Sequence, residues 1–311
     1  MPPTSARPER RHVYQNHHLD STRWDHFTHR PGDIIISTSY KAGTTLMQTI
    51  VGNLLYPYDD APMPMARLSP WIDKRYFPLE LVLNQLAAEP GLRFIKSHLP
   101  LDGLPYWDDV QYIVVGRDPR DVFMSLLNHW EHYAAEQYAT INGTPGRVGD
   151  VFPPFPDDIG QAWRDWIGRG WFTWESDGYP FWSHLHHCRT WWEFRHLPNV
   201  EFVHFADLRA DLDGEMRRIA EVLGIAVPPE RWPHVVDACR FETVKRNPEK
   251  VVGDLDHAFV GGAKLFINKG TNGRWRDLLT DADLVLYQAA MQRALSPDCA
   301  RWLEAGGPIP A

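Results

Sequence analysis

The stretch from Asp33 to Leu55 constrains the fold more than any other part of this chain, because a strand pattern turns directly into a helix pattern there. Ile34 to Ile36 form a β-branched apolar run with the character of a buried strand. From Thr44 onward the apolar residues recur at helical spacing, as far as Leu55. The pattern predicts a strand, a tight turn over Ser37 to Thr44, and a helix, which together form a unit of an α/β sheet.

The same turn has the composition of an anion-binding loop. Gly43 lets the backbone approach a ligand closely, and the first N–H groups of the following helix are unpaired donors. Lys41 adds a mobile positive charge. Because this lysine precedes the glycine and no earlier glycine is present, the loop differs from the Gly-x-x-x-x-Gly-Lys-Ser/Thr loop of nucleoside triphosphatases. The residues alone leave two interpretations open, a phosphate or sulfate site and an ordinary turn closed by a glycine.

Strand and helix patterns alternate along the rest of the chain. Strand patterns lie at residues 92–100, 110–117 and 199–205, and helix patterns at 77–88, 118–130, 181–194, 207–223 and from 281 onward. Asp118 and Pro119 have the character of an N-cap and a first helical residue. The alternation predicts a single α/β domain over residues 13–305, with a central, mostly parallel, doubly wound sheet flanked by helices, after a flexible arm over 1–12.

Charge and cysteine content exclude several classes of protein. The 311 residues carry a net charge of -8 and an isoelectric point near 6.0, which argues against nucleic acid as a partner. Three scattered cysteines form no disulfide framework or zinc ribbon, and the histidines show no spacing typical of a metal site. No apolar run is long enough to span a bilayer, and the N-terminus lacks a targeting pattern. We therefore expect a cytoplasmic protein without a metal or stable membrane insertion, and a homodimer stays open.

Two polar pairs follow predicted strands, at the edge where open α/β sheets bind ligands. Lys96 and His98 are two residues apart after a short apolar run, so an extended backbone points both side chains to one face. Arg117 ends the next strand pattern, and Ser125 lies two turns into the following helix. On the residues alone, His98 is either a hydrogen-bonded surface residue or a base, and Arg117 either pairs with a neighbouring aspartate or binds a ligand.

Taken together, these segments resemble the sulfotransferases that use 3′-phosphoadenosine 5′-phosphosulfate. Lys-Ala-Gly-Thr-Thr at 41–45 resembles the family's Lys-Ser-Gly-Thr-Thr loop, Lys-Ser-His-Leu-Pro at 96–100 is similar to its Lys-Thr-His-Leu-Pro, and the element at 117–125 matches its Arg-x-Pro-Lys/Arg-Asp-x-x-x-Ser. The resemblance implies a P-loop-like phosphosulfate site, a 3′-phosphate site, and a catalytic base with two cations beside it. The residues so implied are Lys41, Ala42, Gly43, Thr44 and Thr45 for the phosphosulfate, Arg117 and Ser125 for the 3′-phosphate, His98 as base, and Lys41 and Lys96 as the catalytic cations.

A later segment at 266–276 resembles the family's Arg-Lys-Gly-x-x-Gly-Asp-Trp loop, which closes over the donor. The resemblance implies that Asn268, Lys269 and Gly270 bind the donor, and it extends more loosely to Phe205 and Phe241 beside the adenine. Four positions depart from the family pattern. Ala42 stands where a serine is usual, Leu46 replaces a tryptophan, Asn268 an arginine, and Phe205 a tyrosine.

The acceptor side is predicted from the aromatic residues. Fourteen tryptophans occur, five of them between Trp163 and Trp182. The Pro- and Met-rich segment 56–76, whose prolines oppose regular helix, and the aromatic segment 130–192 predict apolar walls of an acceptor pocket. The Gly/Pro-rich loop 141–160 is predicted to cover that pocket; the alternative is that the aromatics fill the core.

The predicted reaction is transfer of a sulfuryl group to a hydroxyl of a largely apolar small molecule or glycolipid. Two other functions stay open. A non-catalytic protein that binds adenosine 3′,5′-bisphosphate would use the same phosphate motifs, and a P-loop kinase would need Mg²⁺ and a lysine after its second glycine.

Overall fold

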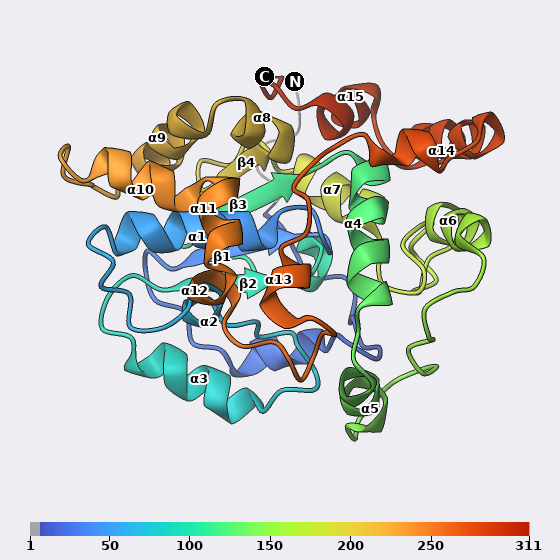
Figure 1. The fold of residues 1–311 in the computed structure, drawn as a ribbon, viewed down its shortest axis with the longest axis horizontal. Helices are drawn as coiled ribbons and strands as arrows, with labels where there is room; N and C mark the ends of the chain where they lie inside the picture. Colours follow the sequence, from blue (N-terminus) through green and yellow to red (C-terminus); the bar gives the residue numbers. More distant parts are fainter. Residues whose placement is uncertain (1–6, 311) are drawn as a thin grey trace.

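A four-stranded parallel sheet in the order β2-β1-β3-β4 forms the centre of the molecule (Figure 1). The computed structural model describes residues 7–310. Its strands are β1 Ile34–Thr38, β2 Phe94–Ser97, β3 Gln111–Gly116 and β4 Val200–His204. In register, Ile35 of β1 lies between Ile95 of β2 and Tyr112 of β3. All pairs are parallel, so the predicted sheet is confirmed.

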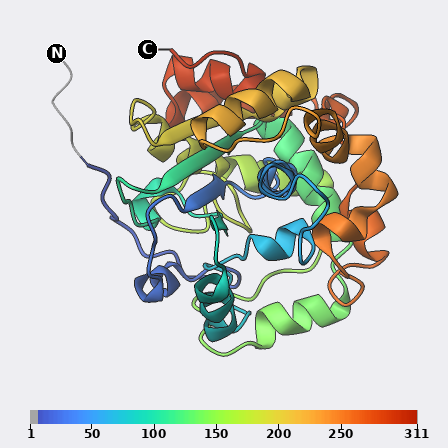
Figure 2. The same ribbon diagram turned by 90° about the vertical axis from the view of Figure 1, so that its left-hand side faces the viewer.

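Helices connect the strands and extend beyond them. Within residues 7–310 the α-helices are α1 Thr44–Leu55, α2 Met65–Leu68, α3 Leu79–Ala88, α4 Pro119–Glu131, α5 Ala135–Gly143, α6 Ile159–Gly168, α7 His184–Trp192, α8 Phe205–Ala210, α9 Leu212–Val222, α10 Trp232–Cys239, α11 Phe241–Arg246, α12 Pro248–Val252, α13 Gly262–Phe266, α14 Asp281–Ala294 and α15 Pro297–Ala305. Figures 1 and 2 both place α14 and α15 (red) at the opposite end of the molecule from α3 and α5.

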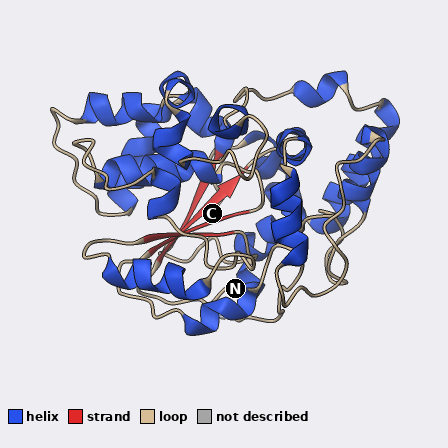
Figure 3. Ribbon diagram, turned by 60° about the horizontal axis from the view of Figure 1, so that its bottom comes forward, coloured by secondary structure: helices blue, strands red, loops and turns tan. Residues whose placement is uncertain are grey.

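Both faces of the sheet are covered by helices, as Figure 3 shows. Both faces need this cover because successive side chains of β1 point to opposite faces of the sheet. Ile34 and Ile36 belong to one buried cluster with Met47 of α1 and Val235 of α10. Ile35 belongs to a second buried cluster that includes residues of α4 and α7. Because each face is buried, the strands are apolar along their length, and the doubly wound architecture is confirmed.

Capping residues set helix boundaries that periodicity alone placed incorrectly. The predicted helix over 207–223 is two helices, because Asp211 leaves the helical conformation with φ −141° and its carboxylate accepts a hydrogen bond from the N–H of Gly214 at 2.9 Å. The helix predicted from residue 181 begins at His184, since the Ser183 hydroxyl caps it by accepting the His186 N–H at 2.8 Å. The predicted N-cap Asp118 is confirmed, with Pro119 as the first helical residue.

The tryptophan-rich segment fills the core. Trp163, Trp182 and Trp191 are at most 2% exposed and belong to the larger buried cluster. The described residues that line the large cleft include Tyr133 and Gln137 but none between 141 and 192. The predictions of an acceptor wall from the tryptophans and of a cover at 141–160 are therefore wrong. Trp163 of α6 packs against Phe123 of α4, and Trp191 of α7 packs against Tyr112 of β3, so these rings fill the interior between the elements.

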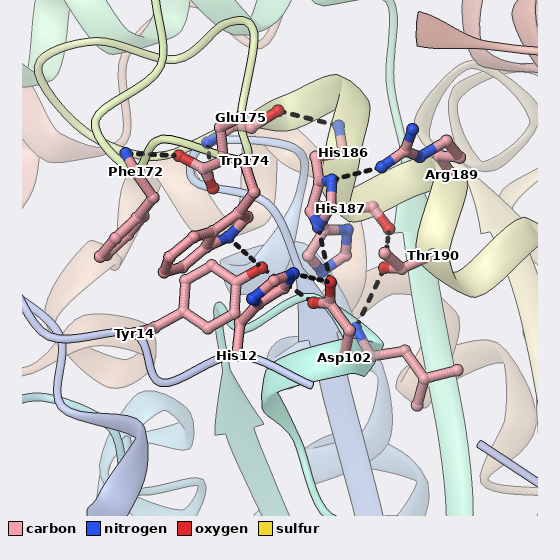
Figure 4. Close-up of polar contacts among 12 residues, drawn as sticks. His12, Tyr14, Asp102, Phe172, Trp174, Glu175, His186, His187, Arg189 and Thr190 are labelled. Carbon is pink, nitrogen blue, oxygen red and sulfur yellow. Dashed lines mark hydrogen bonds and ion pairs between the residues drawn. The ribbon is translucent and has the colours of Figure 1, made fainter. Parts of the chain in front are cut away.

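A polar network attaches the N-terminal segment to the domain beside α7 (Figure 4). The Tyr14 hydroxyl donates to Asp102 at 2.8 Å, and His186 Nε2 lies 2.8 Å from the other oxygen of that carboxylate. The His12 ring stacks on Trp174 with 4.2 Å between centroids. The N–H groups of residues 11 and 12 donate to the Asp102 carbonyl. Residues 7–12 of the predicted arm thus lie against the domain, and residues 1–6 fall outside the described residues.

Candidate active site

The carboxyl ends of all four strands open into one cleft of about 1240 Å³. Shortly after each strand ends, the chain contributes a residue that lines the cleft. These residues are Lys41 after β1, His98 after β2, Arg117 after β3 and Phe205 after β4. β1 and β3 are neighbours in space but not in sequence, so the sheet changes its direction of winding between them. This is the point at which open α/β sheets bind ligands.

The predicted anion loop forms the turn from β1 into α1. Gly43 is the N-cap of α1 with φ 131°, and no side chain within residues 7–310 caps this helix end. The N–H groups of the first turn are therefore available to an anion, and Thr44 and Thr45 line the cleft. A Cβ at Gly43 would lie 3.2 Å from both Phe205 and Val115, and with the positive φ this tight contact favours glycine there.

Ala42 differs from the other predicted loop residues. It is fully buried and does not line the cleft, so the position where the family pattern has serine faces the core in this chain. The preceding residue, Lys41, has a left-handed backbone with φ 67°, which turns the chain between the strand and the helix. The strained turn therefore separates a lysine directed to the cleft from an alanine directed to the core.

His98 has one nitrogen fixed and one free. Its Nδ1 lies 2.8 Å from the carbonyl oxygen of Thr38, and because a carbonyl only accepts, Nδ1 carries the proton. Within residues 7–310 its Nε2 has no hydrogen-bond partner. Burial, and then the charge of Lys96, lower the pKa of His98 well below its usual range, so the imidazole is neutral near pH 7. A neutral imidazole with a free Nε2 is a proton acceptor.

Two lysines supply positive charge next to His98. Burial, followed by the charges of Lys96 and Arg117, lowers the pKa of Lys41 to about 7. Burial, followed by the charge of Lys74, lowers the pKa of Lys96 to about 7. Lys96 Nζ also lies 4.5 Å from the centroid of the Trp71 ring. The site therefore holds two lysines whose charged forms are disfavoured until an anionic ligand offsets their charge.

Arg117 does not form an ion pair with the neighbouring aspartates. Asp118 instead pairs with Arg120, and the guanidinium group of Arg117 lies 4.2 Å from the centroid of the Phe205 ring. Its Nη2 donates to Asn272 at 3.0 Å and its Nη1 to the Lys41 carbonyl at 3.3 Å. Its Nε has no partner within residues 7–310, although the residue is only 7% exposed. Ser125 of α4 lines the same cleft.

The segment predicted to cover the donor lies at the cleft. Asn268, Lys269 and Gly270 all line it, as does Phe241 at the start of α11. Gly270 has φ 61°, and a Cβ there would fall 2.5 Å from the Phe241 ring. Gly270 therefore permits close contact with that ring. Gly273 N–H donates to Asp121 at 2.6 Å and fastens the segment to α4.

Lys41 contacts two residues that the sequence patterns did not single out. Its Nζ lies 3.2 Å from His129 Nδ1 and 4.5 Å from the centroid of the Phe266 ring. An ammonium group only donates, so His129 Nδ1 accepts and its proton lies on Nε2, 2.6 Å from the hydroxyl oxygen of Tyr40. His129 follows Ser125 by one helical turn, and this spacing is the signal that could have identified it.

The hydrogen-bond chain continues from Tyr40 into the interior. Tyr40 donates to the Tyr133 hydroxyl at 2.9 Å, Tyr133 donates to His18 Nε2 at 3.4 Å, and His18 Nδ1 donates to His17 Nδ1. His17 Nε2 donates to the Pro180 carbonyl at 2.8 Å, and this carbonyl sets the direction of every link. The buried pair His17-His18 therefore belongs to a directed chain that ends at Lys41.

Among residues 7–310, no cluster of three or more His, Cys, Asp or Glu side chains has the arrangement of a metal site. In the same part of the chain, no helix has both the length and the apolar character needed to cross a bilayer.

The sulfotransferase domain model matches residues 31–298, which includes the anion loop, His98, Arg117 and the segment at 268–270. This chain belongs to the sulfotransferase family. A glycolipid sulfotransferase of Mycobacterium bovis is 33% identical over 309 residues, covering 94% of each chain. Rat sulfotransferase 1A1 is 27% identical over 289 residues, covering 88% of this chain and 87% of its own.

Solved structures show the same fold. Retinol dehydratase in complex with androsterone and inactive cofactor PAP matches with a TM-score of 0.68 at 23% identity, covering 89% of this chain and 84% of the other. A mouse sulfotransferase complexed with PAP matches with a TM-score of 0.65 at 19% identity, covering 91% of this chain and 92% of the other. The family and the fold class predicted from the sequence are both confirmed.

Proposed function

We propose that this sulfotransferase moves a sulfuryl group from 3′-phosphoadenosine 5′-phosphosulfate to a hydroxyl of a largely apolar acceptor, a small molecule or a glycolipid, with His98 as general base. The observation that carries the proposal is the free Nε2 of His98 in the cleft that also contains the uncapped end of α1. Sulfuryl transfer needs a base for the acceptor and donors for a leaving phosphate. The glycolipid sulfotransferase relatives are consistent with this activity.

The residues of the cleft fit a donor with phosphate groups at both ends of its ribose. The uncapped first turn of α1 and Lys41 would hold the 5′ side, and Arg117, with its buried unpartnered Nε, would hold the 3′-phosphate together with Ser125. The segment with Lys269 would lie over the same group. When bound, this donor supplies the activated sulfuryl group, and its leaving group is a phosphate.

The protein's own part in the reaction follows from the state of His98. Its Nε2 accepts the proton of the acceptor hydroxyl, while Nδ1–H keeps its bond to the Thr38 carbonyl and holds the ring in place. That bond also stabilises the imidazolium that forms. Lys41 offsets negative charge on the departing phosphate oxygen, and Lys96 adds positive charge next to the transfer.

Apolar rings on the other side of the cleft support the apolar acceptor. Trp71, Tyr76, Phe77, Phe259 and Met63 line it. Four of these lie in or next to the predicted segment 56–76, and Phe259 comes from the loop before α13. Rings and a thioether surround an apolar body without competing for hydrogen bonds. The segment 56–76 therefore supplies most of these side chains, and Phe259 adds one from outside the two segments that the sequence suggested.

A transfer assay tests the proposal. The purified full chain is incubated with labelled donor and a panel that contains a phenol, a long-chain alcohol, a glycolipid and an anionic polysaccharide, with and without EDTA. Transfer to the apolar hydroxyl compounds in the presence of EDTA is expected. Tight binding of adenosine 3′,5′-bisphosphate without any transfer would support the non-catalytic alternative, whereas transfer that survives EDTA rules out the kinase. Transfer to the polysaccharide alone would contradict the apolar acceptor.

A further inference from the structure

Lys74 is a cation in the cleft that the donor chemistry does not use. It lines the cleft next to Tyr76 and Phe77, with Nζ 4.7 Å and 5.7 Å from the centroids of their rings. Within residues 7–310 its ammonium group makes no ion pair and no hydrogen bond, and burial lowers its pKa to about 8. A half-buried cation that has no anion beside it is a natural partner for an anionic ligand.

The fold holds Lys74 in this position. The Asp73 carbonyl accepts the Asp20 N–H at 3.0 Å, and the Arg75 N–H donates to the His18 carbonyl at 2.8 Å. Lys74 itself pairs with Leu19 as an isolated antiparallel bridge. The backbone on both sides of Lys74 is thus hydrogen-bonded to residues 18–20. These bonds hold the Lys74 backbone in one position.

The side chains on either side of Lys74 are directed into the protein. Arg75 is 7% exposed and donates to the carbonyls of His17 and Thr144, the latter at 2.7 Å. Asp73 is fully buried. Between these two buried residues, Lys74 is the one of the three that lines the cleft.

The adjacent carboxylate of Asp73 is already occupied. One of its oxygens accepts from Trp24 Nε1 at 3.1 Å, and the other accepts from Trp71 Nε1 at 2.6 Å and from the His98 N–H at 3.2 Å. Asp73 therefore acts as a structural acceptor below the site and does not pair with the Lys74 ammonium group. The positive charge of Lys74 is left for a group that enters the cleft.

Lys74 lies on the acceptor side of the site. It shares a segment with Trp71, whose ring centroid is 4.7 Å from that of His98 and 4.5 Å from Lys96 Nζ. The donor's two phosphate sites draw on other segments, namely the α1 loop, Arg117 and residues 268–270. An acceptor that presents its hydroxyl to His98 along the rings of Trp71 and Tyr76 would therefore extend past Lys74.

We propose that Lys74 forms a subsite for an anionic substituent of the acceptor. Preferred acceptors then combine a hydroxyl, an apolar or aromatic body, and a carboxylate or other anion on that body. This inference rests on the proposed function, because it names the acceptor class of the same site. The aromatic rings beneath the ammonium group place charge recognition next to apolar contact.

Matched phenols test the subsite. The rate of sulfuryl transfer is measured for para-hydroxyphenylacetate and para-hydroxyphenylpropanoate, each against its uncharged primary amide, with wild type, Lys74→Met and Lys74→Arg. Wild type is expected to favour the carboxylate of at least one length by about tenfold or more in kcat/KM, as for a charge-assisted hydrogen bond. Lys74→Met should reduce this ratio to about one, and Lys74→Arg should keep most of it.

Two controls separate this inference from its alternatives. Lys264→Met removes an exposed lysine outside the cleft and should leave the carboxylate preference unchanged. Competitive binding of the same four compounds to the complex with adenosine 3′,5′-bisphosphate, followed by tryptophan fluorescence, measures the charge preference without turnover. A carboxylate preference in binding without any transfer would overturn the proposed function but keep the subsite. Equal behaviour of acid and amide in both assays, or a preference that survives Lys74→Met, overturns the subsite.

Discussion

Binding of adenosine 3′,5′-bisphosphate above neutral pH should draw protons from solution, because lysines of the site are partly uncharged in the free protein. Burial, and then Lys96 and Arg117, lower the pKa of Lys41 from 10.5 to about 7. With that pKa, about 0.1 of Lys41 is charged at pH 8, and about 0.9 is charged at pH 6. A bound phosphate favours the charged ammonium group and moves its pKa back toward the usual value. The expected uptake by Lys41 is therefore about 0.9 proton at pH 8 and about 0.1 at pH 6.

Isothermal titration calorimetry in two buffers of different ionisation enthalpy measures this uptake at each pH. Lys41→Arg is the matched control, because a guanidinium group stays charged throughout this range. The phosphates of the ligand titrate in both proteins, so the difference between wild type and variant isolates Lys41. Affinity of the wild type should also fall above pH 7, by up to about tenfold per pH unit for each lysine involved. Equal uptake by wild type and Lys41→Arg at pH 8 would refute the assignment of a depressed pKa to Lys41.

Substitutions at three positions test the other residues of the site. His98→Ala should lower kcat by about 10²–10⁴ and leave bisphosphate affinity within about twofold, since a base acts on the acceptor proton; turnover close to wild type would remove His98 from the mechanism. Arg117→Ala should weaken binding of adenosine 3′,5′-bisphosphate by roughly 1.5–3 kcal/mol but hardly change binding of adenosine 5′-phosphate, which lacks the 3′ group; equal losses for both ligands would contradict the 3′-phosphate assignment. His129→Phe should lower kcat about tenfold or more, because Lys41 loses its acceptor, while His129→Asn, which keeps an acceptor near the Nδ1 position, should retain most of it; if both variants behave alike in kcat and in donor KM, His129 does not position Lys41.

Much of the site was predictable because its signals are local. A β-branched run, a glycine and a helical period identify the β1 to α1 turn, and the Asp118-Pro119 cap is readable from two residues. Parallel strands all point the same way, so residues that follow them reach one edge of the sheet. The alternation of strand and helix patterns was therefore enough to predict that Lys41, His98 and Arg117 come together.

Other features depend on which sides of distant segments meet, and only the tertiary structure decided them. Trp163, Trp182 and Trp191 are no more aromatic in sequence than Trp71 and Tyr76, yet the first three fill the core and the other two line the cleft. Asp211 breaks a helix that periodicity predicted as continuous, because its carboxylate caps the next one. Neither outcome follows from composition.

The protonation states of the site also depend on three-dimensional contacts. The tautomer of His98 depends on the Thr38 carbonyl, which lies 60 positions away in the chain. The acceptor state of His129 depends on a chain of hydrogen bonds that ends at the Pro180 carbonyl. Lys74 has the same side chain as any surface lysine, and its charge is unpaired because the fold places it in the cleft while the neighbouring Asp73 carboxylate binds other groups. Local patterns determined where the reactive groups occur along the chain. Packing determined their charge and direction, because desolvation and hydrogen-bond partners come from residues that are distant in sequence.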